Sequence, residues 1–123
     1  MPINYTEIGN RWISIWNDHD EAARNRQLTE IWASGASHFA PGFEGHGLKA
    51  IEERVNTAHS RFVKQGGCVI RGVDYAGQGD ALRILWEIAP SNGGDAIATG
   101  SEFMLLDEAG KVRLDYQFND LQR

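Results

Sequence analysis

The hydrophobic pattern of this chain changes its period near Gly67, and this change limits the folds open to it. Before Gly67, apolar residues recur with the helical spacing of three and four positions. After Gly67, apolar and polar residues alternate, as they do in a strand with one buried face. Helices followed by a run of strands indicate an α+β fold with a curled antiparallel sheet, and they exclude the alternating order that builds a parallel α/β sheet.

Three helices are predicted before this change. The first runs over about residues 6–17, and its apolar face is Ile8, Trp12, Ile15 and Trp16. Asp20 is a suitable N-cap for a second helix, which Ser34-Gly35 is expected to end. The third helix runs from Leu48 to about Lys64, before Gly66-Gly67. We expect the polar sides of the later two helices to face water: Arg24, Asn25 and Gln27 on one, Glu52, Glu53 and Arg54 on the other.

The strands follow from turn signals and alternation. A short strand over Ala36–Phe43, bent at Pro41-Gly42, is expected between the second and third helices. The second half of the chain predicts four more strands, Cys68–Tyr75, Ala81–Ala89, Ala96–Leu106 and Lys111–Asn119.

Length and charge limit the functions open to the chain. Its 123 residues suit one domain over 1–123. The net charge of -5 and the lack of a basic stripe argue against a nucleic-acid partner. No export signal and no apolar run of about 20 residues is evident, so we expect a cytoplasmic protein that does not span a membrane. Cys68 is the only cysteine, which excludes an internal disulfide and a thiolate zinc cage.

The last predicted hairpin brings two carboxylates together. If Asp107–Gly110 forms the loop, Glu102 pairs directly with Asp115, with Cβ atoms about 5 Å apart. On a buried face one of these pKa values should rise, and an acid held neutral can donate a proton or a hydrogen bond. The alternation alone favours the other interpretation, in which the opposite, apolar face, with Phe103 and Tyr116, is the core and the carboxylates are solvated.

The usual cofactor and hydrolase motifs are absent from the sequence. It contains no GxGxxG after a strand, no GxxxxGK[ST], no HExxH and no GxSxG, so we predict no cofactor. His38 and His46 could converge on a metal, but no spacing fixes their geometry, and we predict no metal site.

Four segments in a characteristic order resemble a known family. They are Trp12–Asp20 (WISIWNDHD), Leu28–Ala33 (LTEIWA), Phe43–Ile51 (FEGHGLKAI) and Gly100–Val112 (GSEFMLLDEAGKV). Over nearly all of Tyr5–Asp120 the chain resembles the nuclear transport factor two-like superfamily, in its SnoaL-like branch of polyketide-cyclase and ketosteroid-isomerase relatives. The resemblance implies a curved antiparallel sheet wrapped as a cone around three helices, a cystatin-like α+β roll with a pocket at its open end.

The resemblance also implies where site residues lie. It directs His38, Glu102, Asp115 and Gln117 into the cone, and it sets Trp12 at the place of an oxyanion-hole tyrosine. Ala40 takes the place of the proton-abstracting aspartate of ketosteroid isomerases, and alanine cannot act as a base. In SnoaL-like cyclases the last strand carries an inward His and Asp, and Asp115 and Gln117 take those places here.

These observations lead to two hypotheses for function. The first is a cofactor-free isomerase, cyclase or lyase acting on a small apolar or aromatic carbonyl or ring compound, with His38, Glu102 and Asp115 as catalytic residues. In it, Trp12, Trp16, Trp86 and Gln117 bind the ligand, with His38 at one side of the pocket. The second is a non-catalytic ligand-binding or protein-docking module with the same fold.

An inward Glu102 and Asp115 would leave apolar side chains on the outer face of the sheet. These are Leu85, Phe103, Leu105, Leu114, Tyr116 and Phe118. A patch of that size is unusual on a monomer, so we predict a homodimer that pairs through the sheet.

Overall fold

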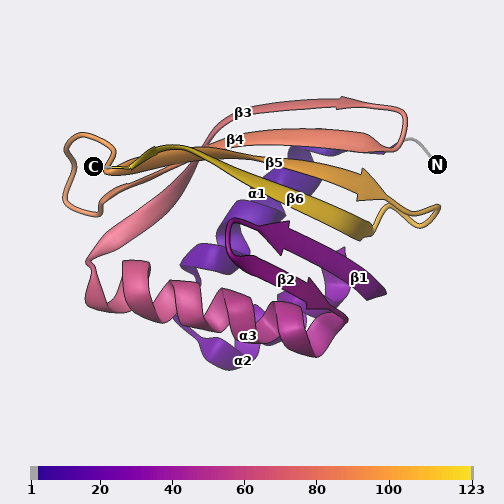
Figure 1. Ribbon diagram of the computed structural model, residues 1–123, viewed down its shortest axis with the longest axis horizontal. Coiled ribbons are helices and arrows are strands. Elements are labelled where there is room, and N and C mark those ends of the chain that lie inside the picture. The colour runs from indigo at the N-terminus through magenta and orange to yellow at the C-terminus, as the bar shows by residue number, and fades with distance from the viewer. Residues whose placement is uncertain (1–2, 123) are drawn as a thin grey trace.

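A six-stranded sheet curves over three helices in the computed structural model, which describes residues 3–122 (Figure 1). The strand order is β2-β1-β6-β5-β4-β3. The strands are β1 Trp32–Ala40, β2 Phe43–His46, β3 Cys68–Gln78, β4 Ala81–Pro90, β5 Ala98–Leu106 and β6 Val112–Gln122. The α+β architecture predicted from the sequence is confirmed.

Two N-terminal helices begin at side-chain caps. Helix α1, Tyr5–Asn17, starts at Asn4, whose side chain accepts a hydrogen bond from the backbone N–H of Glu7. Helix α2, Glu21–Ile31, starts at the predicted cap Asp20. It ends before Ser34-Gly35, where the sequence predicted its end, because the chain passes directly into strand β1 at Trp32, and the Trp32 side chain is buried in the core.

The third helix changes its winding partway along. Helix α3 covers Leu48–Ala58 and continues as the π-helical segment η1, His59–Gln65, where the sequence predicted one α-helix to about Lys64. The wider turns rotate the buried face, so that His59 and Val63 enter the core while Phe62 is only half-buried. The altered phase brings Phe62 to the wall of a hollow described below.

The predicted bent strand is two strands joined at Pro41-Gly42. Gly42 has φ +74°, a left-handed conformation that suits glycine, and the turn pairs β1 with β2 in antiparallel fashion. Strand β1 also pairs with β6 in parallel, so the sheet is not wholly antiparallel as predicted. This contact joins the first and last strands of the chain, which no hairpin pattern could indicate.

The two faces of the sheet differ as the alternation of β4 predicted. Leu82, Ile84, Trp86 and Ile88 are all buried against the helices. The outer face carries exposed aromatic side chains, with Phe103 45%, Tyr116 37% and Phe118 56% exposed. The core therefore lies between the sheet and the helices, and the interpretation in which Phe103 and Tyr116 form the core is wrong. Within residues 3–122, no helix has both the length and the apolar character needed to cross a membrane.

Arg24 is buried rather than solvated, contrary to the sequence prediction. It is 5% exposed, its Nη1 donates to the carbonyl oxygen of Asp18 at 2.7 Å, and its Nε donates to Asn56 Oδ1 at 3.0 Å. These bonds tie the α1–α2 connection to α3, which explains why a cation can be buried here.

Gly100 provides a test of the packing between β4 and β5. It lies opposite Trp86, and a Cβ at this position would overlap the Trp86 ring and the carbonyl oxygen of Phe118. We expect Gly100→Ala to lower the free energy of unfolding by about 2 kcal/mol, measured by chemical denaturation. Gly35→Ala is the control, because nothing lies within 4 Å of a Cβ there. Equal stability of the two variants would contradict this account of the packing.

Candidate functional site

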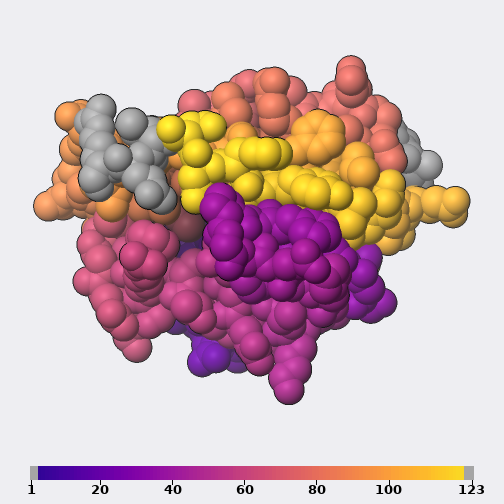
Figure 2. All heavy atoms as spheres, viewed as in Figure 1, coloured from indigo at the N-terminus to yellow at the C-terminus, as the bar shows by residue number. Residues whose placement is uncertain are grey.

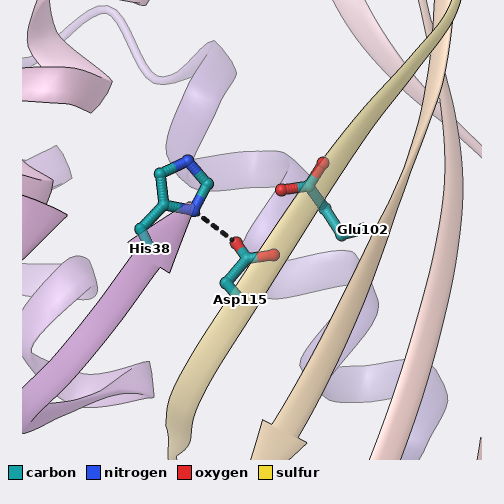
Figure 3. A group of neighbouring side chains, drawn as sticks. All are labelled: His38, Glu102 and Asp115. Carbon is teal, nitrogen blue, oxygen red and sulfur yellow. Dashed lines mark ion pairs between the residues drawn. The ribbon is translucent and has the colours of Figure 1, made fainter. Parts of the chain in front are cut away.

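Three buried titratable side chains meet on the inner face of the sheet (Figure 3). His38 comes from β1, Asp115 from β6 and Glu102 from β5, and their exposed fractions are 1%, 0% and 0%. His38 Nδ1 lies 3.2 Å from Asp115 Oδ2. One ligand-type atom of each residue lies within 4.8 Å of the other two. We call these three residues the buried triad.

The parallel pairing of β1 with β6 brings the first two together. His38 and Asp115 are direct partners in that register. Two rings also pack around the imidazole, Trp32 edge-on at 5.9 Å between centroids and Phe43 at 5.7 Å. The orientation of His38 is therefore set by packing as well as by Asp115.

The register of β5 with β6 differs from the one predicted by the loop count. Glu102 pairs with Gln117 and Asp115 with Met104. One residue of this shift arises because Leu106 pairs with Val112 instead of Lys111, and the second arises at the irregularity between Leu105 and Leu106. The predicted direct pairing of Glu102 with Asp115 is wrong. The shift equals a full side-chain repeat of two, so both carboxylates still point to the same, inner face. They are diagonal neighbours instead of opposed ones.

Burial controls the protonation of Glu102. Removal from water raises the pKa of this carboxyl well above its ordinary value, and the nearby negative charge of Asp115 raises it further. The Trp86 indole N–H, which donates to Glu102 Oε2 at 2.7 Å, and the positive charge of Arg54 act in the opposite direction. Glu102 is thus a carboxyl group that stays protonated at pH values where an exposed glutamate has ionised.

The buried triad retains several atoms without hydrogen bonds. Among the described residues, both nitrogens of His38, Oε1 of Glu102 and both carboxylate oxygens of Asp115 have no hydrogen-bond partner. The 3.2 Å contact of His38 with Asp115 is an ion-pair distance without the alignment of a hydrogen bond. Buried polar atoms are normally satisfied, so this cluster has unused capacity for a proton, a ligand or a water. One nitrogen and two carboxylates would also suit a divalent cation.

A hollow beside the triad is lined by the tryptophans that the sequence singled out. Its volume is about 50 Å³, and Trp12, Trp16, Trp86 and Gln117 all contribute to its wall. A larger hollow of about 390 Å³ adjoins it on the outside and shares five lining residues with it, namely Arg54, Phe62, Trp86, Ile88 and Gln117. Figure 2 shows the surface recessed between the pink end of the third helix and the yellow strand β6. We call the two the inner and outer hollows.

The triad lies behind the wall of these hollows and does not line them. His38, Glu102 and Asp115 are all absent from the lining residues, so the expectation that His38 borders the pocket is wrong. Trp86 and Gln117 separate the hollows from the triad. Trp86 donates a hydrogen bond to Glu102, and Gln117 is the cross-strand partner of Glu102. The wall and the triad are therefore in direct contact through Glu102.

Arg54 is a site residue that the sequence analysis missed. It lines both hollows, its Cζ lies 5.1 Å from the centroid of the Phe43 ring, and its Nε is buried without a hydrogen-bond partner. Burial lowers the pKa of its guanidinium, and the Glu102 charge opposes this shift. The expectation that Arg54 faces water was wrong. The signal was its spacing, because Arg54 lies three residues after Ile51 and four before Ala58, both on the buried face.

The raised pKa of Glu102 predicts a pH dependence of stability. The folded chain holds this proton more tightly than the unfolded chain does, so the contribution to stability is complete below about pH 4.5 and is lost as the pH rises through the folded-state pKa. We expect Glu102→Gln to remove this loss. The free energy of unfolding of Glu102→Gln minus that of the wild type should therefore rise with pH, by up to about 1.4 kcal/mol per pH unit. Chemical denaturation at several pH values from 5 to 7.5 measures this difference.

Glu53→Gln is the matched control, because Glu53 is an exposed glutamate on α3. Its difference from the wild type should stay flat over the same pH range. If Glu102→Gln also gave a flat difference, Glu102 would ionise with an ordinary pKa in the folded protein.

Comparison with known proteins places the fold. No family model matches the chain, and no curated protein matches it in sequence. Solved structures do match. A SnoaL-like protein from Agrobacterium tumefaciens, named as a candidate isomerase, has a TM-score of 0.85 at 22% identity, over 94% of this chain and 97% of that one.

Two further structures agree with the first. An NTF2-like protein of unknown function from Exiguobacterium sp. 255-15 has a TM-score of 0.72 at 17% identity, over 92% of this chain and 98% of that one. A candidate polyketide cyclase from Sinorhizobium meliloti has a TM-score of 0.69 at 16% identity, over 95% and 94%. The chain therefore has the nuclear transport factor two-like fold, in the form found in SnoaL-like proteins.

Proposed function

We propose that this protein binds a small, largely apolar molecule in the two hollows and that the buried triad moves a proton on it. The observation that carries the proposal is the contact of Trp86 with Glu102. Trp86 lines both hollows, and its indole N–H donates to Glu102, the carboxyl whose pKa is raised by burial. A ligand against Trp86 and Gln117 is thus one side chain away from a protonated acid. The names of the relatives, a candidate isomerase and a candidate polyketide cyclase, support this class of chemistry.

Each member of the triad has a role in such a reaction. The imidazole of His38 takes a proton from a carbon next to a carbonyl group, and Asp115, 3.2 Å away, stabilises the resulting imidazolium. The electrons of the broken C–H bond form a carbon–carbon double bond, while the proton of Glu102 passes to the carbonyl oxygen. The imidazolium of His38 then gives its proton to the opposite face of the same carbon or, in a conjugated dienol, to another carbon. The enol oxygen returns its proton to the Glu102 carboxylate as the carbonyl re-forms, which completes an isomerisation without a cofactor. The substrate oxygen reaches Glu102 when the Trp86 or Gln117 side chain moves aside.

Ligand binding without turnover is the second candidate function. The observation that favours it is the absence of His38, Glu102 and Asp115 from the residues that line the hollows. In this case the triad is a buried polar feature of the core, and Trp12, Trp16, Trp86 and Gln117 form a binding site only.

Exchange of carbon-bound hydrogen separates the two functions. The small enolisable ketone 2-tetralone is incubated with the protein in D₂O, and deuterium at its α-carbons is followed by proton NMR. We expect the protein to accelerate exchange, and His38→Gln and Asp115→Asn each to reduce that acceleration about 100-fold, which is typical of a lost general acid or base. Glu53→Gln should exchange at the wild-type rate, since Glu53 is exposed and lies outside the site.

Binding is measured in the same samples by the fluorescence of the wall tryptophans. Quenching without accelerated exchange would overturn proton transfer and establish the binding function. An absence of both quenching and exchange across a panel of ketones would overturn the proposed function as a whole.

We also propose that two copies pair through the outer face of the sheet. Phe103, Tyr116 and Phe118 are exposed there, and Leu85, Leu105 and Leu114 are half-buried beside them. A stable interface buries about 800 Å² per partner, with an apolar centre. This face supplies such a centre on a chain whose net charge is -5.

Sedimentation velocity tests the pairing. We expect a dimer at micromolar concentration and monomers or aggregates for the double variant Tyr116→Lys/Phe118→Lys. Glu53→Lys is the control, because Glu53 is exposed on α3, on the far side of the molecule from that face. A wild-type monomer at this concentration would contradict the pairing.

A further inference from the structure

The outer hollow has an unusual charge for this protein. Two arginines, Arg54 and Arg61, line it, and none of its described lining residues is a carboxylate. The chain as a whole carries 17 acidic against 12 basic residues, so a positive mouth opposes the overall composition. The uncharged polar residues of the wall are Thr99, Gln117 and Asn119. The local potential thus favours an anion at the entrance.

Neither arginine lies within ion-pair distance of a carboxylate among residues 3–122. Each guanidinium instead lies over an aromatic ring, Arg54 over Phe43 and Arg61 over Phe62, both at 5.1 Å. Stacking of this kind supports the flat face of the group and leaves its N–H edge available for a ligand.

The two arginines lie at different depths in the hollows. Arg54 is half-buried, lines both hollows and keeps its Nε buried without a partner, which is a cost that a bound acceptor would remove. Arg61 is exposed and lines only the outer hollow. Arg61 lies seven positions after Arg54, which places it about 10 Å further along the helix axis. One small anionic group can therefore contact Arg54 while Arg61 attracts it from the rim of the outer hollow.

Apart from Arg54 and Gln117, the residues that line the inner hollow are apolar or aromatic. Trp12, Trp16, Ile70 and Ile88 surround the inner hollow. We propose that the ligand is an amphipathic monoanion, an aromatic or alicyclic carboxylate, whose carboxylate binds Arg54 and whose ring lies against Trp86. This inference rests on the proposed function, since it concerns the ligand of the same site, and it names the chemical class that the hollows select.

The same surroundings favour a carboxylate over a phosphate. Arg61 lies in η1, toward the C-terminal end of the helix, where the aligned peptide dipoles carry partial negative charge. No residue at the N-terminus of α1, α2 or α3 lines the outer hollow, so the backbone N–H groups that commonly hold phosphates are not supplied. A single planar carboxylate matches the fork of one guanidinium.

Matched probes test the inference on the full chain. 2-Naphthoate, its neutral isostere 2-naphthamide and the dianionic 2-naphthyl phosphate are titrated while tryptophan fluorescence is recorded. We expect 2-naphthoate to bind at least about 10-fold more tightly than 2-naphthamide, since a hydrogen bond to a charged group commonly contributes a factor of 10 or more. Its affinity should fall with added NaCl, whereas that of the amide should not.

Variants then assign the effect to residues. Arg54→Gln should weaken 2-naphthoate at least about 10-fold and change 2-naphthamide less than about 2-fold, because only the anion loses a charged partner. Arg61→Gln should weaken 2-naphthoate by about 3-fold, and only at low salt. Lys49→Gln is the control: it removes the same charge from an exposed position of α3 that does not line the hollows. Arg54→Lys keeps the positive charge and should recover part of the affinity for 2-naphthoate. Its circular dichroism spectrum tests whether the fold tolerates substitution at this position.

Three results would overturn the inference while leaving the proposed function intact. They are 2-naphthamide binding as tightly as 2-naphthoate, Arg54→Gln weakening both probes equally, and 2-naphthyl phosphate binding more tightly than 2-naphthoate. A failure of all three probes to bind would overturn the inference and the proposed binding site together.

Discussion

The parallel contact between β1 and β6 is the interaction on which the rest of this structure depends. It joins the hairpin of β1 and β2 to the four-stranded meander and so completes the curved sheet over the helices. The same contact makes His38 the direct neighbour of Asp115. Without it neither the closed core nor the buried triad would exist, because both need strands that lie at opposite ends of the sequence.

Burial of the triad is costly, because its polar side chains are removed from water and only part of their hydrogen-bonding capacity is satisfied. An unpaired buried charge disfavours folding, and here a proton on Glu102 removes one of the two negative charges. The hydrogen bond from Trp86 holds that carboxyl while its other oxygen stays unpartnered. An apolar core of similar volume would avoid these costs. The arrangement is consistent with a site that handles protons.

The positive entrance and the acidic interior are complementary parts of one site. Arg54 lies between them, at the boundary of the outer and inner hollows, and its charge acts on Glu102. A bound carboxylate would neutralise Arg54 and thereby favour the protonated form of Glu102 further. With the proposed ligand, binding at Arg54 and the protonation of Glu102 would therefore be linked.

The sequence by itself determined the order of the elements, the N-cap of α2 and the buried face of β4. The alternation over Leu82–Ile88 and the N-cap at Asp20 depend on neighbours in the chain, and the structure agrees with both. Its inward assignment of Glu102 and Asp115 survived a wrong register only because the error was an even number of residues. Family resemblance, more than alternation, favoured the buried face.

Only the tertiary structure decided what depends on contacts between distant segments. The parallel β1–β6 pairing, the hydrogen bond of Arg24 to Asn56 and the turn of Arg54 into the hollows all join residues far apart in the chain. Local periodicity classes an arginine beside two glutamates as solvated. Whether its guanidinium instead lies over an aromatic ring and lines a cavity is settled by packing between helix and sheet, which no local pattern encodes.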